Sequence, residues 1–195
     1  MRKTGALLTL ILLVLMAASV ANAAPINYIF QGTGAGYLGG SYFENTAFTI
    51  TLTGDTNNVQ DQGGGLFVNV ASSGQVAIQG LNTADFLIPM QLFVNQPFNV
   101  AGLSRAPDAA DLIDMSDPSF GGYDLKTAFG PVLIPFPYFG QFNCQWGCVS
   151  TSQGDLEFIS MTDVSFSATT VPEPGTLMLM GAGALGLVQR LRRKQ

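Results

Sequence analysis

Four aspartates recur at intervals of three residues in the segment APDAADLIDMSDPSF. They are Asp108, Asp111, Asp114 and Asp117. We expect Asp108 to cap a short helix that holds these carboxylates near one another, where they would repel unless a cation such as calcium bound. The spacing lacks the alternate-residue D-x-D-x-D-G order of a calcium loop, so a solvated acidic loop is the favoured interpretation and a cation site is the alternative.

A second group combines aromatic rings with the two cysteines of the chain. Cys144 and Cys148 enclose Gln-Trp-Gly, and such a pair in an exported chain predicts a disulfide rather than a redox or metal pair. Flat aromatic faces stack on sugar rings, so the neighbouring rings predict a carbohydrate-binding surface unless they pack in the core. These rings are Tyr138, Phe139, Phe142 and Trp146, of which Trp146 is the strongest candidate.

Residues for catalysis are scarce. The chain has no histidine, which removes Ser-His-Asp and Cys-His chemistry and the commonest zinc ligand. Paired carboxylates hydrolyse glycosides without histidine, but between residues 24 and 171 the glutamates are only Glu44 and Glu157, and no arrangement singles out a pair. We therefore expect no enzyme, no cofactor and no metal beyond the cation alternative above.

β-Structure must position these residues, because apolar and polar residues alternate along most of the central region. In TAFTITLTG, Phe48, Ile50 and Leu52 face one way and the threonines the other. Further strands are expected in INYIFQG, GLFVNVA, GQVAIQG, FLIPMQLFV, DLEFISM, TDVSFSATT and parts of 123–139. Pro89 lacks the N–H that a ladder needs, so we place it at an edge or a bulge.

Glycine-rich segments separate these strands. GTGAGYLGG lacks the G-K-[ST] ending of a phosphate-binding P-loop, and we interpret it as a turn between strands. Many short strands with close turns predict an all-β fold, an antiparallel β-sandwich of jelly-roll or immunoglobulin-like type, with a barrel as the runner-up.

Charge between residues 24 and 171 is sparse and acidic. Every acidic residue except Glu173 lies there, against Arg105 and Lys126 as the only cations. This region is therefore more acidic than the whole chain, whose formal net charge is −5. Because phosphate binding depends on lysine and arginine, nucleic acid is excluded as a partner, whereas divalent cations and neutral glycans are compatible.

The first residues have the pattern of a signal peptide. Arg2 and Lys3 precede an apolar run at residues 6–18, followed by small residues where signal peptidase would cut. The residues around the cut are Ala21, Ala23 and Ala24. We expect Ala24 to become the first residue, with an uncleaved N-terminal anchor as the alternative.

Residues 171–195 combine three features in order. Pro172, Glu173 and Pro174 favour an extended segment, an uncharged run follows, and basic residues complete the segment. The basic residues are Arg190, Arg192, Arg193 and Lys194. The run is shorter than the roughly twenty residues of a comfortable membrane helix, so it indicates a transiently inserted transfer signal, with a permanent transmembrane anchor as the alternative.

This ordered tail resembles the PEP-CTERM sorting signal of Gram-negative bacteria. IFQGTGAGYLGG and GGYDLKTAFGP are also similar, more loosely, to the β-rich bodies that accompany such tails. The resemblance implies processing near Pro-Glu-Pro by exosortase, a membrane cysteine protease-transpeptidase, and delivery to the cell surface or extracellular polysaccharide. It carries no catalytic residue.

We thus expect three parts: a signal peptide at 1–23, a β-sandwich domain at 24–170 and a sorting signal at 171–195. The predicted protein is exported with the help of signal peptidase, inserted transiently in the membrane, and structural or adhesive in exopolysaccharide or biofilm. The alternative is a β-sandwich that binds or cleaves carbohydrate through carboxylates and aromatic rings.

Overall fold

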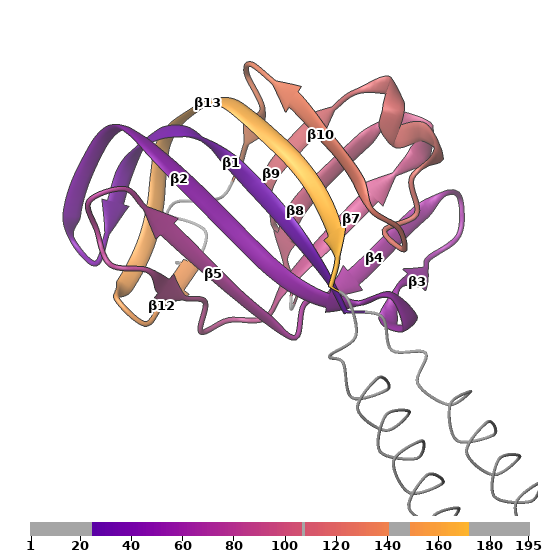
Figure 1. The fold of residues 1–195 in the computed structure, drawn as a ribbon, viewed down its shortest axis with the longest axis horizontal. Coiled ribbons are helices and arrows are strands. Elements are labelled where there is room, and N and C mark those ends of the chain that lie inside the picture. Colours follow the sequence, from indigo (N-terminus) through magenta and orange to yellow (C-terminus); the bar gives the residue numbers. More distant parts are fainter. Residues whose placement is uncertain (1–24, 107, 141–148, 172–195) are drawn as a thin grey trace, which may run out of the picture. The chain divides into compact units, whose positions relative to one another are not determined.

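The computed structural model of the protein describes residues 25–106, 108–140 and 149–171 (Figure 1). Contacts group Ala24–Val171 into one compact unit. The described residues form two antiparallel sheets that do not close into a barrel, so the all-β sandwich prediction is confirmed. Their helical content is three short 3₁₀ segments: η1 (Thr56–Asn58), η2 (Gln96–Phe98) and η3 (Pro118–Gly122).

Two sheets of different strand length make up the sandwich. Sheet A has the order β10-β13-β1-β2-β5-β6, with β12 also paired to β13. Its strands are β1 (Pro25–Leu38), β2 (Ser41–Asp55), β5 (Ser73–Ile78), β6 (Ala84–Asp85), β10 (Phe129–Ile134), β12 (Val149–Thr151) and β13 (Gly154–Thr170). Sheet B has the order β11-β9-β8-β7-β4-β3. Its strands are β3 (Gln60–Asp61), β4 (Leu66–Val70), β7 (Met90–Asn95), β8 (Val100–Arg105), β9 (Asp111–Ser116) and β11 (Tyr138–Phe139).

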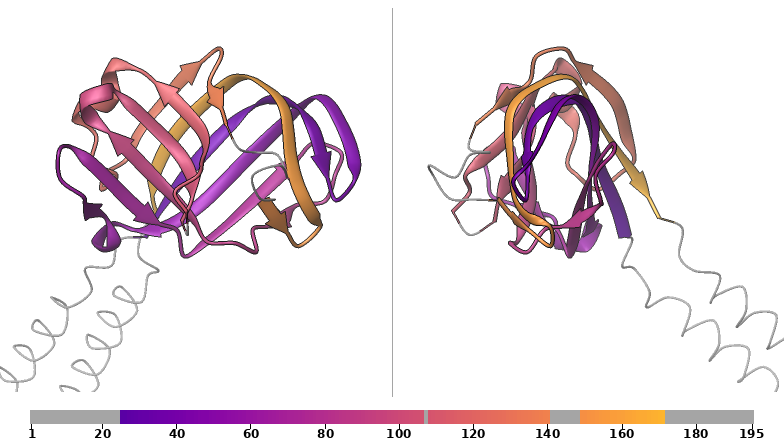
Figure 2. Two further views of the ribbon diagram at one scale, coloured as in Figure 1. Left: turned by 180° about the vertical axis from the view of Figure 1, so that it is seen from behind. Right: turned by 90° about the vertical axis from the view of Figure 1, so that its left-hand side faces the viewer.

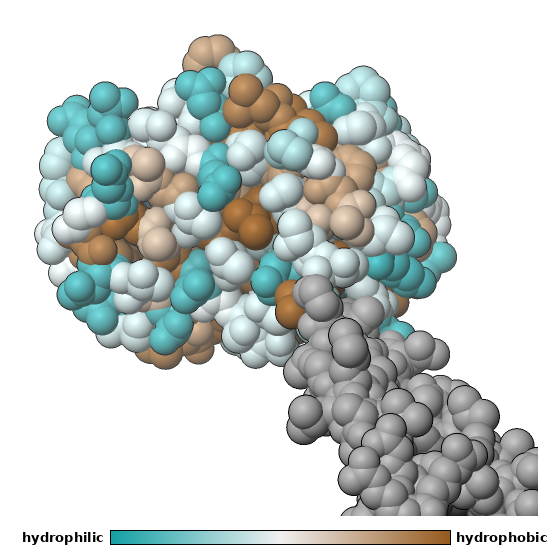
Figure 3. All heavy atoms as spheres, viewed as in Figure 1, coloured by the Kyte–Doolittle hydropathy of each residue, from teal (hydrophilic) through white to brown (hydrophobic). Residues whose placement is uncertain are grey.

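The predicted alternation holds along the long strands of sheet A. Phe48, Ile50 and Leu52 of β2 are all buried, while the threonines between them lie on the opposite, outer face. Figure 3 shows this outer face as mainly pale and hydrophilic side chains, with apolar side chains gathered over β10. Burial of one face thus fixes the register of the strands, because a slip of one residue would turn every apolar side chain outward.

The glycine-rich segment was predicted wrongly as a turn. Residues 32–38 belong to β1, and only Gly39 and Gly40 form the turn to β2. Gly32, Gly34 and Gly36 lie on the inner face, where an added Cβ would crowd Val164, Phe158 and the backbone of β13. Without side chains there, the aromatic rings of Phe48 and Phe158 can pack against the strand, and the long strands bend over the domain (Figure 2).

Two further predictions need correction. The Pro89 strand is neither at an edge nor bulged there, because β7 begins after Pro89 and runs in the middle of sheet B. The expected helix near Asp108 is absent from the described residues, since β9 occupies Asp111–Ser116. Neither β8 nor β9 was predicted from sequence. β8 is buried on both faces, and its pairing with β9 shifts in register between Leu103 and Ser104, so these strands lack a regular alternation of apolar and polar residues.

A polar cluster around Tyr28 and Asn69 lies in the core between the sheets. The Tyr28 hydroxyl donates to the Leu125 carbonyl at 2.6 Å and accepts from Asn69 Nδ2 at 2.7 Å. Asn69 Nδ2 also donates to the Asp55 carbonyl at 3.2 Å. Both Tyr28 and Asn69 are fully buried, so these bonds satisfy groups that would otherwise be costly to remove from water.

The first and last described residues are hydrogen-bonded neighbours. Ile26 pairs with Thr170 across β1 and β13, and the Val171 N–H donates to the Pro25 carbonyl at 2.8 Å. Figure 1 shows the start of β1 beside the arrowhead of β13. The domain therefore begins and ends at one point of sheet A.

Candidate functional site

An exposed pair of tyrosines lies at the other end of β1. Tyr37 and Tyr42 are cross-strand partners on either side of the Gly39-Gly40 turn, with ring centroids 5.2 Å apart. They are 39% and 52% exposed, so both rings present a face to solvent. Glu157 of β13 lies directly opposite Tyr37. Three neighbouring strands thus bring two rings and one carboxylate into one row.

Sequence reasoning missed this tyrosine pair, although the sequence contains a signal for it. In YLGGSY the two tyrosines stand symmetrically about Gly-Gly. A two-residue hairpin turn at the glycines makes residues at equal distances from it cross-strand partners. The mistaken interpretation of GTGAGYLGG as a longer turn concealed that register.

The predicted aspartate cluster is dispersed in the structure. Asp108 forms an ion pair with Arg105 at 2.6 Å, while Asp111 and Asp114 lie on β9. Asp117 caps η3 by accepting from the Ser119 N–H at 2.8 Å. Within the part of the chain that the structure describes, no three acidic side chains gather in a way that could hold a metal. Asp108 and Asp117 therefore have separate local partners, whereas Asp111 and Asp114 remain neighbours on β9.

Asp114 is the most perturbed of these acids. Its pKa is raised to about 6, mainly because burial disfavours the charged form and secondly because of the Asp111 charge. Burial also raises the pKa of Asp111. The buried Oδ1 atom of Asp114 has no hydrogen-bond partner, and Tyr138 of β11 lies opposite it in register.

The predicted aromatic group is only partly described. Tyr138 is 65% exposed, whereas Phe139 is half-buried and packs against the core. Phe142, Trp146, Cys144 and Cys148 lie outside the described residues, and so does the predicted disulfide. The exposed apolar side chains nearest in sequence to Tyr138 are Leu133 and Phe136, in β10 and after it.

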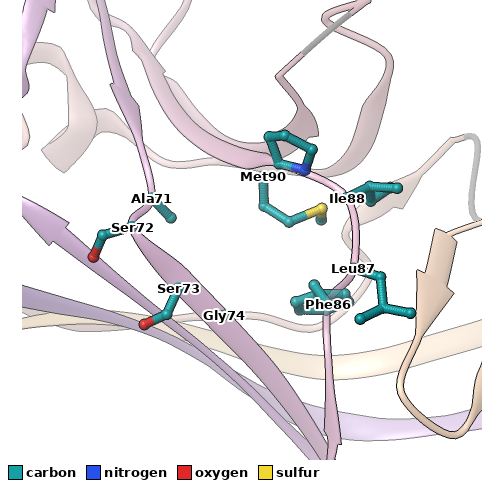
Figure 4. Close-up of a pocket in the computed structure, with 9 residues that line it drawn as sticks. Ala71, Ser72, Ser73, Gly74, Phe86, Leu87, Ile88 and Met90 are labelled. Carbon is teal, nitrogen blue, oxygen red and sulfur yellow. The ribbon is translucent and has the colours of Figure 1, made fainter.

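A small cavity lies where the chain twice crosses between the sheets. The connection from β4 to β5 faces the connection from β6 to β7, and the space between them measures about 240 Å³ (Figure 4). Phe86 and Met90 point into this space, whereas Leu87 and Ile88 point away from it. Its volume is below the range of about 300–1,000 Å³ that is usual for small-molecule pockets. We assign it no ligand.

The glutamates considered for glycoside hydrolysis stand on different strands. Glu44 is exposed on β2, and Glu157 is half-buried on β13 beside the tyrosine pair. The acids that do influence each other are Asp111 and Asp114 on sheet B.

Comparison with known families identifies the segment at the end of β13. The family model of the PEP-CTERM protein-sorting motif matches residues 170–194. This chain carries a PEP-CTERM sorting signal. A search of curated proteins and a search of solved structures found no match.

The PEP-CTERM motif implies export, association with the cell surface and processing by an exosortase. Its matched range includes every residue predicted for the sorting signal, from Pro172 to Lys194. Those residues and the signal-peptide cleavage residues lie outside the described part of the chain. Among the described residues, no helix has the length and apolar character of a membrane span.

Two residues of the PEP-CTERM match are described, Thr170 and Val171. Thr170 is the last residue of β13, and Val171 is hydrogen-bonded to Pro25. The match therefore begins inside the folded sheet, at the end of β1 opposite to the tyrosine pair.

Proposed function

We propose that this PEP-CTERM protein is a non-catalytic, adhesive component of the extracellular polysaccharide of a Gram-negative bacterium. Signal peptidase would remove residues 1–23, the tail would be inserted transiently in the membrane, and exosortase would process it near Pro-Glu-Pro. The observation that carries the adhesive role is the exposed Tyr37–Tyr42 pair beside Glu157.

The chemistry of this row suits a sugar chain. Exposed aromatic rings provide apolar faces on which the C–H faces of sugar rings can stack, and a neighbouring carboxylate accepts hydrogen bonds from hydroxyl groups. The domain holds nearly all the acidic residues of the chain and has only Arg105 and Lys126 as cations. Charge repulsion therefore favours a neutral polysaccharide over an anionic one.

The position of the row supports the same function. β1 starts at Pro25, beside the residues where the sorting motif begins, and reaches Tyr37 near its other end. An attachment made through the sorting motif would therefore leave the tyrosine row at the far end of the strand. An adhesive surface needs this separation, because its ligand approaches from outside.

Retention on the host's own neutral polysaccharide tests the adhesive role. We expect Tyr37→Ala/Tyr42→Ala to weaken retention about thirtyfold, since each ring contributes on the order of 1 kcal/mol. Tyr138→Ala is the comparison variant, because it removes another exposed tyrosine, on sheet B. Equal retention of the double variant and the wild-type protein would contradict the proposal.

The same experiment compares this surface with the aromatic group predicted from sequence. If Tyr138→Ala or Trp146→Ala abolishes retention while the double tyrosine variant binds normally, the sugar-binding surface lies around the cysteine loop. In that case the adhesive function stands and its assignment to the β1–β2 hairpin is wrong.

A hydrolase acting on the same polysaccharide is the second candidate function. It is favoured by Asp114, because a carboxyl with a raised pKa near a second carboxylate is the arrangement of a glycosidase acid. Release of reducing ends by the wild-type protein, lost in Asp114→Asn, would support the hydrolase. Binding without release supports the adhesive function.

A further inference from the structure

The folded sheet extends into the segment that the model of the sorting motif matches. The family match starts at residue 170, and Thr170 is still paired with Ile26. The Val171 N–H is bonded to the Pro25 carbonyl at 2.8 Å. Pro172 follows directly in sequence, so no linker separates the last sheet hydrogen bond from the Pro-Glu-Pro residues.

Enzymes that cut or transfer a peptide commonly bind it as an extended strand, through main-chain hydrogen bonds on both sides of the reacting bond. In this chain the main chain before Pro172 already makes such bonds to β1. The same N–H and carbonyl groups cannot serve both partners at once. Binding of the tail in an active-site groove therefore competes with the end of the β1–β13 pair.

The end of β13 is held loosely for three residues and firmly behind them. Thr169 and Thr170 have exposed side chains, and their strand partners are Asn27 and Ile26 of β1. On the other side, the pairing of β13 with β10 reaches only to Ala168, opposite Phe129.

Ala168 and Phe166 are 1% exposed, so opening beyond Thr169 would disrupt the core. Opening of residues 169–171 breaks backbone bonds at a sheet end, where fraying is expected, and uncovers only the edge of the core at Ile26 and the half-buried Val171. The segment that can open therefore ends at Ala168, which is buried and paired with β10.

We propose that residues 169–171 detach from β1 when exosortase binds, and that this opening limits the rate of processing. The folded domain then influences its own processing rate, because the stability of the pairing of residues 169–171 with β1 controls the access of exosortase to the motif. This inference concerns the shared residues alone and does not depend on polysaccharide binding.

A disulfide across the strand end tests the proposal in the full chain, expressed in its native host. Asn27→Cys/Thr169→Cys joins direct cross-strand partners, which lie at a separation that a disulfide can bridge. Gln31→Cys/Ser165→Cys is the matched control, because it locks the same two strands behind Ala168 and leaves residues 169–171 free to open. Intact mass reports both formation of the lock and the processed fraction over time.

We expect the Asn27–Thr169 lock to slow processing at least about tenfold, and the Gln31–Ser165 lock to leave the rate within about twofold of wild type. A flexible insert of about four Gly and Ser residues between Val171 and Pro172 should restore the rate in the locked variant, since it supplies unpaired main chain. Equal rates for the two locks would overturn the proposal. So would a locked variant that the insert fails to rescue.

Discussion

The two ends of the β1–β13 strand pair are held by different interactions. Toward the end with Tyr37, the inner face of β1 carries glycines, and beside them the Phe158 ring contacts Phe43 and Phe48 at centroid distances of 5.5 and 4.8 Å. At the end with Pro25, exposed threonines are held to β1 by backbone pairing. One end is fixed by close packing, and the other by a few hydrogen bonds.

This difference shows that local stability can change along a single pair of strands. Close packing tolerates no added atoms and opens only when the core is disrupted, whereas a sheet end opens with little loss of core packing. The rigid end carries the exposed tyrosines, and the loosely held end adjoins the sorting motif. Four substitutions test this contrast.

Gly36→Ala should have the largest effect. A Cβ at this position would overlap the carbonyl oxygen of Glu157, and backbone on a paired strand cannot move aside. We expect the free energy of unfolding in urea to fall by more than about 3 kcal/mol. Gly122→Ala is the control, because no atom lies within 4 Å of its added Cβ. Equal stability of the two variants would mean that the glycine end is not tightly packed.

Tyr28→Phe tests the interior beneath the loosely held end. Loss of the hydroxyl removes the partner of the buried Leu125 carbonyl and one partner of Asn69 Nδ2. We expect a loss of about 2 kcal/mol in the free energy of unfolding. The exposed Tyr42→Phe should change it by less than about 0.5 kcal/mol. A negligible effect of Tyr28→Phe on the free energy of unfolding would show that the interior around Tyr28 is loosely held as well.

Asp114→Asn tests sheet B, away from both strand ends, through its dependence on pH. Because the pKa of Asp114 is raised to about 6, the folded protein binds this proton more tightly than the unfolded chain does. The stabilisation is complete below the ordinary pKa of 3.8 and is lost as the pH rises through about 6.

We therefore expect Asp114→Asn to be more stabilising at pH 8 than at pH 4, by about 1 kcal/mol after allowance for the partial exposure of the side chain. Thermal unfolding at the two pH values measures the difference. An effect independent of pH would show that Asp114 titrates normally.

Thr169→Ala should have the smallest effect on stability, below about 0.5 kcal/mol, because its side chain is exposed at the strand end. Hydrogen exchange gives the sharper measurement: the Val171 amide should exchange far faster than the amides of β13 around Phe166. Similar exchange rates for the Val171 amide and the amides around Phe166 would show that this end of β13 is not loosely held.

Much of sheet A could be predicted from sequence, because its strands have one buried face. β2 was predicted from the alternation around Phe48, Ile50 and Leu52. The strands of sheet B were harder to predict: β8 is buried on both faces, and β9 contains an irregularity in its pairing. Glycines in β1 were mistaken for a turn because local sequence does not reveal that rings from β2 and β13 fill the space beside them.

The candidate sites were predictable to different degrees. The sorting motif is a local pattern, and its presence was predicted from sequence. The tyrosine pair needed only the hairpin register about Gly39 and Gly40. The pairing of Ile26 with Thr170 joins residues far apart in the chain, which no local pattern encodes. The burial that perturbs Asp114 likewise depends on the complete sandwich.

The position of β13 between β10 and β1 has a consequence for the order of folding during export. When a chain crosses a membrane from its N-terminus, β1 crosses early. Its neighbour β13 is the last strand of the chain to cross. Contacts of such long sequence separation form late, and sheet A stays incomplete until residue 170 has crossed. At that moment the sorting motif is the next segment to arrive, so completion of the fold and presentation of the signal coincide in time.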